Sequence, residues 1–367
     1  YTGMTPQDFH DFVFGIADNI GFDRKKIIIG GDHMGPLPWY TQSADQAMEN
    51  AIELVRLCVR AEYQKIHLDT SMRLGDDPID TPLETRVVAT RGAILYKACE
   101  DEFEKLKNEK PDAVHPVFVI GSEVPVPGGI RDVGAKCEVT DSKDFEETLL
   151  TYREVFSKMG LDDAWNYIVA VVVQPGVEFG NNEIKIYDRV AAHALCDTLR
   201  KYPDIVFEGH STDYQPPAKL KEMVEDGIAI IKVGPALTFA LRDALYALSS
   251  IETIVIQDPA ERANFPSVLE EEMKQHPKQW SKYYFGTELD KKIDRSFSLS
   301  DRCRYYLATE TVNAAIEKLF KNIDSVNIPL GLLHQYMPLQ YMKVINGILS
   351  VNAKELVKDS VVTIIDD

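Results

Sequence analysis

Two histidines, each close to a carboxylate in the sequence, mark the segments of this chain best suited to chemistry. His33 follows Asp32 in the segment GGDHMGP, and His210 lies far away in the segment EGHSTDY. An acid and an imidazole side by side can divide the work, because one can bind a metal while the other transfers a proton. Flanking glycines let a ligand approach the backbone closely. The alternative is an ordinary tight turn, in which Asp32 caps the next segment and His33 is merely exposed.

The two histidines can share a metal only if the strands before them end on the same face of the fold. In that case a divalent ion held by His33, His210 and Glu123 is predicted, with zinc as the leading candidate and Asp32 as the proton carrier. Glu123 belongs to a loop rich in proline and glycine, where it could also be a base or anchor the loop. His67 alternates with apolar neighbours, so we expect a buried histidine with satisfied hydrogen bonds rather than a ligand.

Other polar side chains follow these or neighbouring strands and are candidates for binding a substrate. Lys232 lies just before Gly234 and Pro235, where a helix should begin, so its ammonium and the first amides of that helix could hold an anion. A lone lysine before a helix is common, so this signal is weak by itself. The candidate substrate-binding residues are Asp69, Ser71, Gln174, Ser211, Asp213 and Lys232.

Short apolar runs that alternate with long amphipathic segments must position these residues. Each run is continuously apolar, as in strands buried on both faces of a parallel sheet. The predicted strands are Lys26–Gly30, Lys65–Asp69, Pro116–Gly121, Tyr167–Val173, Asp204–Phe207 and Ile228–Val233. The predicted helices are Ser43–Ala61, Pro82–Asn108, Asp144–Met159, Asp188–Lys201, Pro216–Val224 and Pro235–Ser250. This alternation indicates an α/β protein with a parallel sheet.

Polar or glycine-containing residues at the end of every predicted strand favour a barrel over an open sheet. All strands of a (β/α)8 TIM barrel open onto one face, whereas an open sheet needs such endings only near its switch point. Six strands are predicted, so we expect the first two upstream of Tyr1, after which a helix capped by Thr5 soon begins. We predict a barrel domain over residues 1–252 and a mainly helical C-terminal region over 253–367 packed on it, with a helix at 300–322.

Composition excludes several classes of partner. The 367 residues carry 40 Lys plus Arg against 58 Asp plus Glu, a formal net charge of −18. Nucleic acid and anionic membrane surfaces are polyanions, so neither is an expected partner. No apolar run is long enough to span a membrane. Five scattered cysteines without a CxxC pair indicate neither a disulfide framework nor a zinc ribbon, and they fit a reducing compartment such as the cytoplasm.

The motifs taken together resemble one known family. GGDHMGP, KIHLDTS, GSEVPVPGG, VVVQPGVEFG, FEGHSTDYQ, IKVGPALTFALRDAL and SLSDRCRYY are similar to the tagatose-bisphosphate aldolase non-catalytic subunits, also described as tagatose-6-phosphate kinases. That family is similar in turn to the class II metal-dependent aldolases, which are (β/α)8 barrels. The resemblance implies a subunit of an aldolase complex in galactitol or N-acetylgalactosamine catabolism. No P-loop or protein-kinase motif supports the kinase description.

The resemblance also implies roles for individual residues. The Asp-His pair of class II aldolases, which supplies the acid/base and one zinc ligand, corresponds to Asp32 and His33, and a later zinc ligand corresponds to His210. A third histidine ligand of those aldolases has no counterpart, because the corresponding strand here ends in Gln174, Pro175 and a glycine. This altered metal site agrees with an accessory role.

Two functions therefore stay open, beside an inert barrel that only binds a partner. In the favoured one, the chain supports the activity and stability of a catalytic aldolase subunit. In the other it is a metal-dependent ketose 4-epimerase, in which Asp32 takes the C4 hydroxyl proton while the metal stabilises the enediolate left when C3–C4 breaks. Either function involves a phosphorylated or free ketohexose. The oligomeric state, a homo-oligomer included, is left open.

Overall fold

The computed structural model describes residues 3–81, 83–121 and 138–366, and it confirms the alternation of strands and helices. Six parallel strands form one sheet in the order β1-β2-β3-β4-β7-β8. They are β1 (Gly30–Met34), β2 (Lys65–Leu68), β3 (Val117–Ile120), β4 (Ile168–Val173), β7 (Val206–Gly209) and β8 (Ile228–Ile231). Each was predicted to within a few residues, except β1.

The sheet curls so strongly that side chains from its two edges meet. Asp32 on β1 forms an ion pair with Lys232, which directly follows β8, although β1 and β8 lie at opposite ends of the strand order. Lys65 on β2 likewise pairs with Glu208 on β7, across the concave face. In the described residues no strand joins β8 to β1. The predicted eight-stranded TIM barrel is therefore confirmed only as a curled parallel sheet of six strands, half of a barrel in form.

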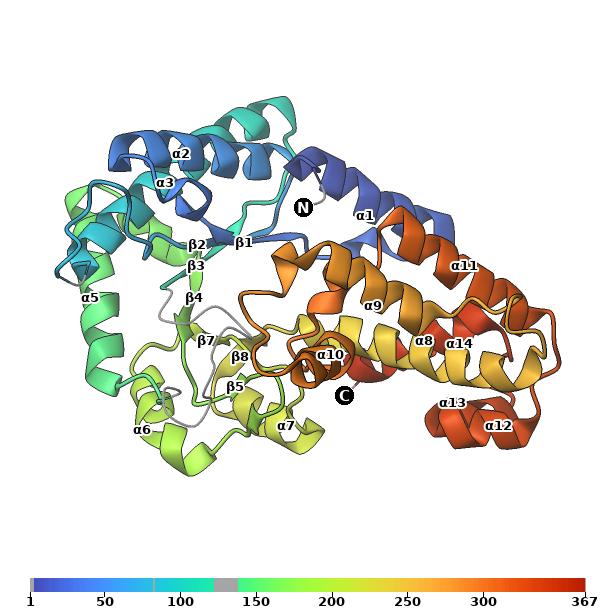
Figure 1. Ribbon diagram of the computed structural model, residues 1–367. Helices are drawn as coiled ribbons and strands as arrows, with labels where there is room; N and C mark the ends of the chain where they lie inside the picture. The colour runs from blue at the N-terminus through green and yellow to red at the C-terminus, as the bar shows by residue number, and fades with distance from the viewer. Residues whose placement is uncertain (1–2, 82, 122–137, 367) are drawn as a thin grey trace.

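Helices cover the convex face of this sheet, and Figure 1 shows them in an arc around it. They are α2 (Ala44–Arg60), α3 (Thr85–Glu109), α5 (Ser142–Lys158), α6 (Arg189–Leu199) and α7 (Pro217–Glu225). Alternate strand residues separate two apolar clusters: Phe118 and Ile120 of β3 belong to the large core beneath the helices. Val119 instead packs with Ala170 and Val172 in a small cluster of its own. Both faces of β3 and β4 are apolar, which explains why these two strands read as unbroken apolar runs.

A second apolar core lies among the C-terminal helices, on the other side of the molecule in Figure 1. The long helix α8 (Pro235–Val255) contributes Leu245, Leu248 and Ile251 to it. The remaining helices are α9 (Phe265–Gln275), α10 (Glu288–Phe297), α11 (Glu310–Asp324), α12 (Leu330–Tyr336), α13 (Pro338–Ile345) and α14 (Ala353–Asp366). The mainly helical character of this region was predicted, and a domain boundary at residue 252 remains a prediction.

The N-terminal helix α1 (Pro6–Ile20) begins as predicted. Thr5 accepts a hydrogen bond from the backbone of Asp8, whose side chain accepts one in return from the backbone of Thr5, and Pro6 occupies the first turn. This reciprocal pair satisfies donors that an uncapped helix would leave without partners. Short 3-10 helices connect several elements: η1 (Arg24–Lys26), η2 (Leu37–Trp39), η3 (Asp162–Asn166), η4 (Pro277–Gln279) and η5 (Arg302–Tyr305).

Two local predictions were wrong, and one element was missed. The first strand does not cover Lys26–Gly30, because pairing with β2 begins only at Gly30, and Ile28 before it is 71% exposed. Residues 300–322 do not form one helix, because Asp301 has a φ of 43° and its carboxylate forms a buried ion pair with Arg242 of α8. A short antiparallel hairpin was not predicted at all. It consists of β5 (Glu178–Phe179) and β6 (Ile184–Lys185).

Two negative predictions can be compared with the described residues. Among them, no helix combines the length and the apolar character that a membrane span requires. The cysteines within the same ranges carry free thiols.

Candidate metal centre

Three histidines and one aspartate converge where the parallel strands end. Asp32 and His33 come from β1, His67 from β2, and His210 directly follows β7. One ligand atom from each lies within 4.8 Å of all the others. The ring centroids of His33 and His210 are 5.2 Å apart, so the prediction that these two distant residues share one rim is confirmed.

A local irregularity in β1 presents the Asp32-His33 pair to the site. The pairing register between β1 and β2 shifts between Gly31 and Met34, so one stretch of β1 bulges out of the ladder. His33 has a φ of 50°, a conformation that costs energy for a residue with a Cβ. In a regular strand, adjacent side chains point to opposite faces. The bulge instead lets Asp32 and His33 both reach the cluster.

His67 is oriented by a backbone carbonyl on the neighbouring strand. Its Nε2 lies 2.7 Å from the carbonyl oxygen of Gly121, which accepts a hydrogen bond and so places a proton on Nε2. Its Nδ1 faces the centre and lies 3.1 Å from Asp32 Oδ1. The side chain is fully buried, as predicted, but the prediction that it is only a satisfied core histidine missed this second nitrogen.

His33 is oriented in the same manner by a carboxylate. Its Nδ1 lies 2.7 Å from Asp69 Oδ2, so Asp69 accepts the Nδ1 proton and leaves Nε2 to face the centre. Asp69 is held in turn by the backbone N–H and hydroxyl of Ser71, which both donate to Oδ1. Asp69 and Ser71 were predicted to bind substrate, and the structure places them behind His33. A carboxylate behind a ligating histidine is the usual arrangement around protein-bound metals.

His210 lies in a buried network of opposite charges. Its Nε2 is 3.0 Å from Glu208 Oε1, and Glu208 is also paired with Lys65. Both Glu208 and His210 are almost completely inaccessible to solvent. Within the described residues, Nδ1 of His210 is buried and has no hydrogen-bond partner. Glu208 was not predicted as a site residue, although its position two residues before His210 puts both on the same side of the strand end.

Lys232 points into the same group of side chains. Its Nζ lies 3.0 Å from His210 Nε2 and 3.4 Å from His33 Nε2, and it forms an ion pair with Asp32. The ammonium is therefore a positive charge at the centre of the cluster. It does not point to the start of α8, where it was predicted to bind an anion.

Burial favours the neutral imidazole of His210, whereas nearby hydrogen bonds and cations favour the ionised carboxylates of the site. Burial, aided by Lys232 and His67, lowers the pKa of His210. Burial opposes ionisation of Glu208, but the hydrogen bond from His210 and the nearby Lys65 lower its pKa to about 2. Burial likewise opposes ionisation of Asp32, yet His67 and Lys232 hold the pKa of that carboxyl well below its usual range. Burial lowers the pKa of Lys232, although Asp32 and Glu208 act in the opposite direction.

Of the three other predicted substrate-binding residues, Asp213 and Gln174 have local structural contacts. Asp213 caps α8, since its Oδ1 accepts hydrogen bonds from the backbone N–H groups of Gly234 and Ala236 at 2.9 and 2.8 Å. It thereby occupies the amides that were expected to hold an anion. Gln174 accepts hydrogen bonds from the backbone of its own loop. Ser211 is buried, with a φ of 53°.

The predicted ligand Glu123 lies outside the described residues. Its part in the site therefore stays a prediction.

The donor set fits a divalent transition-metal ion. Imidazole and carboxylate are the ligands that zinc and related ions prefer, and four donors suit a tetrahedral site. Gly121 and Asp69 fix the tautomers of two of the three histidines, as the outer shell of a metal site does. The neutral state of His210 leaves a lone pair available for coordination.

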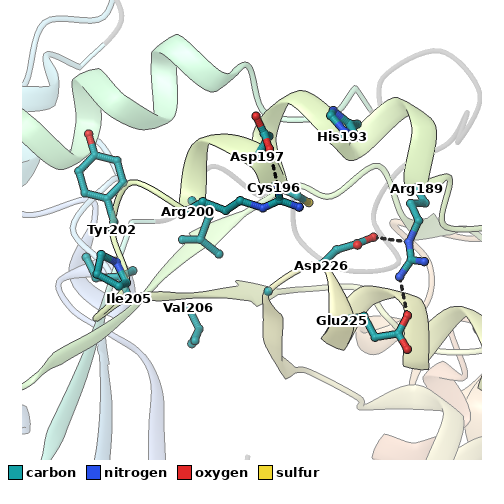
Figure 2. A pocket seen from close by; sticks show the side chains of 13 residues that line it. Arg189, His193, Cys196, Asp197, Arg200, Tyr202, Ile205, Val206, Glu225 and Asp226 are labelled. Carbon is teal, nitrogen blue, oxygen red and sulfur yellow. Dashed lines mark hydrogen bonds and ion pairs between the residues drawn. The ribbon is translucent and has the colours of Figure 1, made fainter.

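A pocket of about 630 Å³ lies at the other end of the strands from the histidine cluster. Figure 2 shows its lining between α6, the end of α7 and the start of β7. Arg189 pairs there with Glu225 and Asp226, and Arg200 pairs with Asp197. No residue of the histidine cluster lines this pocket, and its arginines already have carboxylate partners.

Fold and site together define a class: α/β proteins in which a curled parallel sheet carries, at its strand ends, a histidine and carboxylate cluster suited to a divalent metal. A family model described as "D-tagatose-1,6-bisphosphate aldolase subunit GatZ/KbaZ-like" matches residues 1–367. The chain belongs to this GatZ/KbaZ-like family.

Individual relatives agree with that membership. The chain is 44% identical over 361 residues to the D-tagatose-1,6-bisphosphate aldolase subunits GatZ of Salmonella dublin and Salmonella gallinarum, which covers 98% of this chain and 83% of each relative. A crystal structure described as a "probable tagatose 6 phosphate kinase" from Sinorhizobium meliloti 1021 superimposes with a TM-score of 0.89 at 41% identity. That match covers 100% of this chain and 88% of the other.

Proposed function

We propose that this chain is a subunit of a D-tagatose-1,6-bisphosphate aldolase and that it supports the activity and stability of a separate catalytic subunit. The observation that carries this proposal is the 44% identity to GatZ subunits over nearly the whole chain. The place of action is the cytoplasm, in galactitol or N-acetylgalactosamine catabolism. The free thiols of the described cysteines are compatible with such a reducing compartment.

We further propose that Asp32, His33, His67 and His210 bind one divalent metal ion, with zinc as the first candidate. A divalent ion there would supply a Lewis acid for the carbonyl of a ketose. The chain's own residues have clear tasks around it: Asp69 and Gly121 orient two imidazoles. Asp32 supplies negative charge on the solvent side, since its side chain is 42% exposed.

A second candidate function is a metal-dependent ketose 4-epimerase, and the intact cluster is the observation that favours it. A purely structural subunit needs no three histidines around one carboxylate. The comparisons give this alternative no support. While Asp32 is held by His67 and Lys232, its low pKa also makes it a weak base for the C4 hydroxyl proton.

The chain should increase the cleavage of D-tagatose 1,6-bisphosphate by a catalytic aldolase subunit from the same organism. We expect at least a fivefold higher rate and a higher melting temperature of the catalytic subunit on mixing, because a bound partner stabilises the folded state. Triose phosphate release and thermal unfolding measure these effects. An unrelated acidic protein at equal concentration is the control. The aldolase proposal fails if the chain gives no more stimulation than this control, and epimerisation of ketohexoses by the chain alone would support the alternative.

Asp69→Asn should weaken the binding of Zn²⁺ by ten- to a hundredfold, the usual effect of losing a carboxylate behind a ligating histidine. The amide can no longer accept the Nδ1 proton of His33 with a full negative charge, so the ring is held less firmly. Isothermal titration measures the affinity. Asp188→Asn, which changes a remote helix cap that asparagine also forms well, is the matched control. Equal affinities for both variants would show that Asp69 does not act on the metal.

A further inference from the structure

One ammonium group occupies the space between the candidate metal ligands. Nζ of Lys232 lies 3.0 Å from His210 Nε2, 3.4 Å from His33 Nε2 and 3.7 Å from Glu208 Oε1. It also forms an ion pair with Oδ2 of Asp32. Three of the four candidate ligands are thus in contact with the same positive charge.

Hydrogen bonds hold the backbone of Lys232 in place, so any movement of its ammonium must come from the side chain. Its backbone N–H donates to the carbonyl of Gly209 at 3.1 Å, and its own carbonyl accepts a hydrogen bond from the Thr212 hydroxyl at 2.8 Å. The side chain is 22% exposed, and the adjacent side chain of Asp32 is 42% exposed, so the solvent side of the site is open. A lysine on a flexible four-carbon stem can swing its ammonium toward that side.

We propose that Lys232 is the resident cation of this site and that a divalent metal ion binds only when its ammonium group moves out toward solvent. The lysine therefore sets the metal affinity of the chain. This inference rests on the metal centre proposed above and adds a competitor to it.

The competition follows from space and charge. The ammonium lies within 3.4 Å of a ring nitrogen of both His210 and His33, so it fills the space from which a metal ion would contact these imidazoles. An ammonium and a divalent ion also repel each other strongly in a partly buried site. Without Lys232, Asp32 loses its ammonium partner, and a metal ion can take that place. Lys65 still pairs with Glu208 in that case, so the buried carboxylate is not left alone.

Titration of the full chain with Zn²⁺ and with Mn²⁺, after removal of bound metal by a chelator, tests this proposal. Lys232→Met keeps most of the side-chain volume and removes the charge, and we expect it to bind both ions at least tenfold more tightly than the unmodified chain. Lys232→Gln serves as a second neutral variant in case methionine disturbs folding, which circular dichroism will reveal. Lys110→Met removes a lysine from a surface ion pair with Glu62 and should leave the affinity unchanged.

The outcomes separate the two proposals. Equal or weaker metal binding by both folded Lys232 variants overturns the role of Lys232 and leaves the metal centre standing. No metal binding by any of the proteins overturns both proposals. Binding by the Lys232 variants alone supports the competition in its strongest form.

Discussion

Gly35→Ala should destabilise the chain by about 3 kcal/mol or more, because overpacking against fixed backbone is costly. A Cβ at this position would lie 1.7 Å from the carbonyl oxygen of Asp69 and 2.8 Å from its carbonyl carbon. The Asp69 N–H donates to the carbonyl of Met34 at 3.1 Å, so the ends of β1 and β2 are tied together at this point. The methyl group would have to separate them. Urea unfolding measures the loss.

Gly15→Ala in α1 is the matched control for this prediction. Nothing lies within 4 Å of a Cβ at Gly15, and alanine is the better helix former, so we expect a gain of roughly 0.5–1 kcal/mol. The two glycine substitutions should thus have opposite signs. Equal unfolding midpoints for the two variants would contradict the close approach of the strands. Because Asp69 also holds His33, the Gly35 variant should in addition bind metal more weakly.

His33→Ala should lower the affinity for a divalent ion by at least a hundredfold. The substitution removes one of four candidate ligands, and the loss of a direct ligand should exceed the ten- to hundredfold effect of losing an outer-shell partner. The side chain of His33 is 32% exposed, so the fold should tolerate its loss better than the loss of buried His67 or His210. Metal content after dialysis and isothermal titration measure the change.

His193→Ala is the control for the histidine experiment. His193 is an exposed residue on α6, in the pocket of Figure 2 at the other end of the strands. Its loss should leave metal binding unchanged. If the His33 and His193 variants retain the same metal content as the unmodified chain, the cluster is not a metal centre.

The architecture was largely predictable because the signals were local and repeated. A run such as Ile168–Val173 is apolar at every position, and it forms β4 as predicted. Helix caps were equally readable, as Thr5 shows. Whether the sheet closes into a barrel was not predictable in this way. Closure depends on which strands pair across the two edges of the sheet and not on any single segment.

The candidate site was predicted in part. Asp32, His33 and His210 come together as expected, because parallel strands place their carboxyl ends on one rim. The role of His67 was missed, although a signal was present. Lys65, His67 and Asp69 occur at every second position and so share one side of β2, where each contacts a charged or polar group of the site.

Other features of the site depend on choices between partners that a sequence does not contain. The first amides of α8 could have bound an anion held by Lys232, or they could have been capped by the side chain of Asp213. The structure gives the amides of that helix to Asp213 and sends Lys232 to Asp32. The bulge that turns His33 inward is likewise a product of the pairing of β1 with β2, and nothing in the motif itself reveals it.

Helix α8 mechanically couples two distant parts of the molecule. At its start, the backbone N–H of Gly234, two residues after Lys232, donates a hydrogen bond to Asp213. Its second half packs among the C-terminal helices. A helix of 21 residues is about 30 Å long and resists bending, so a displacement of one end is passed to the other. A protein that shifted the C-terminal helices would therefore also move the backbone beside Lys232 and, if this lysine competes with a metal as proposed, would change the metal affinity.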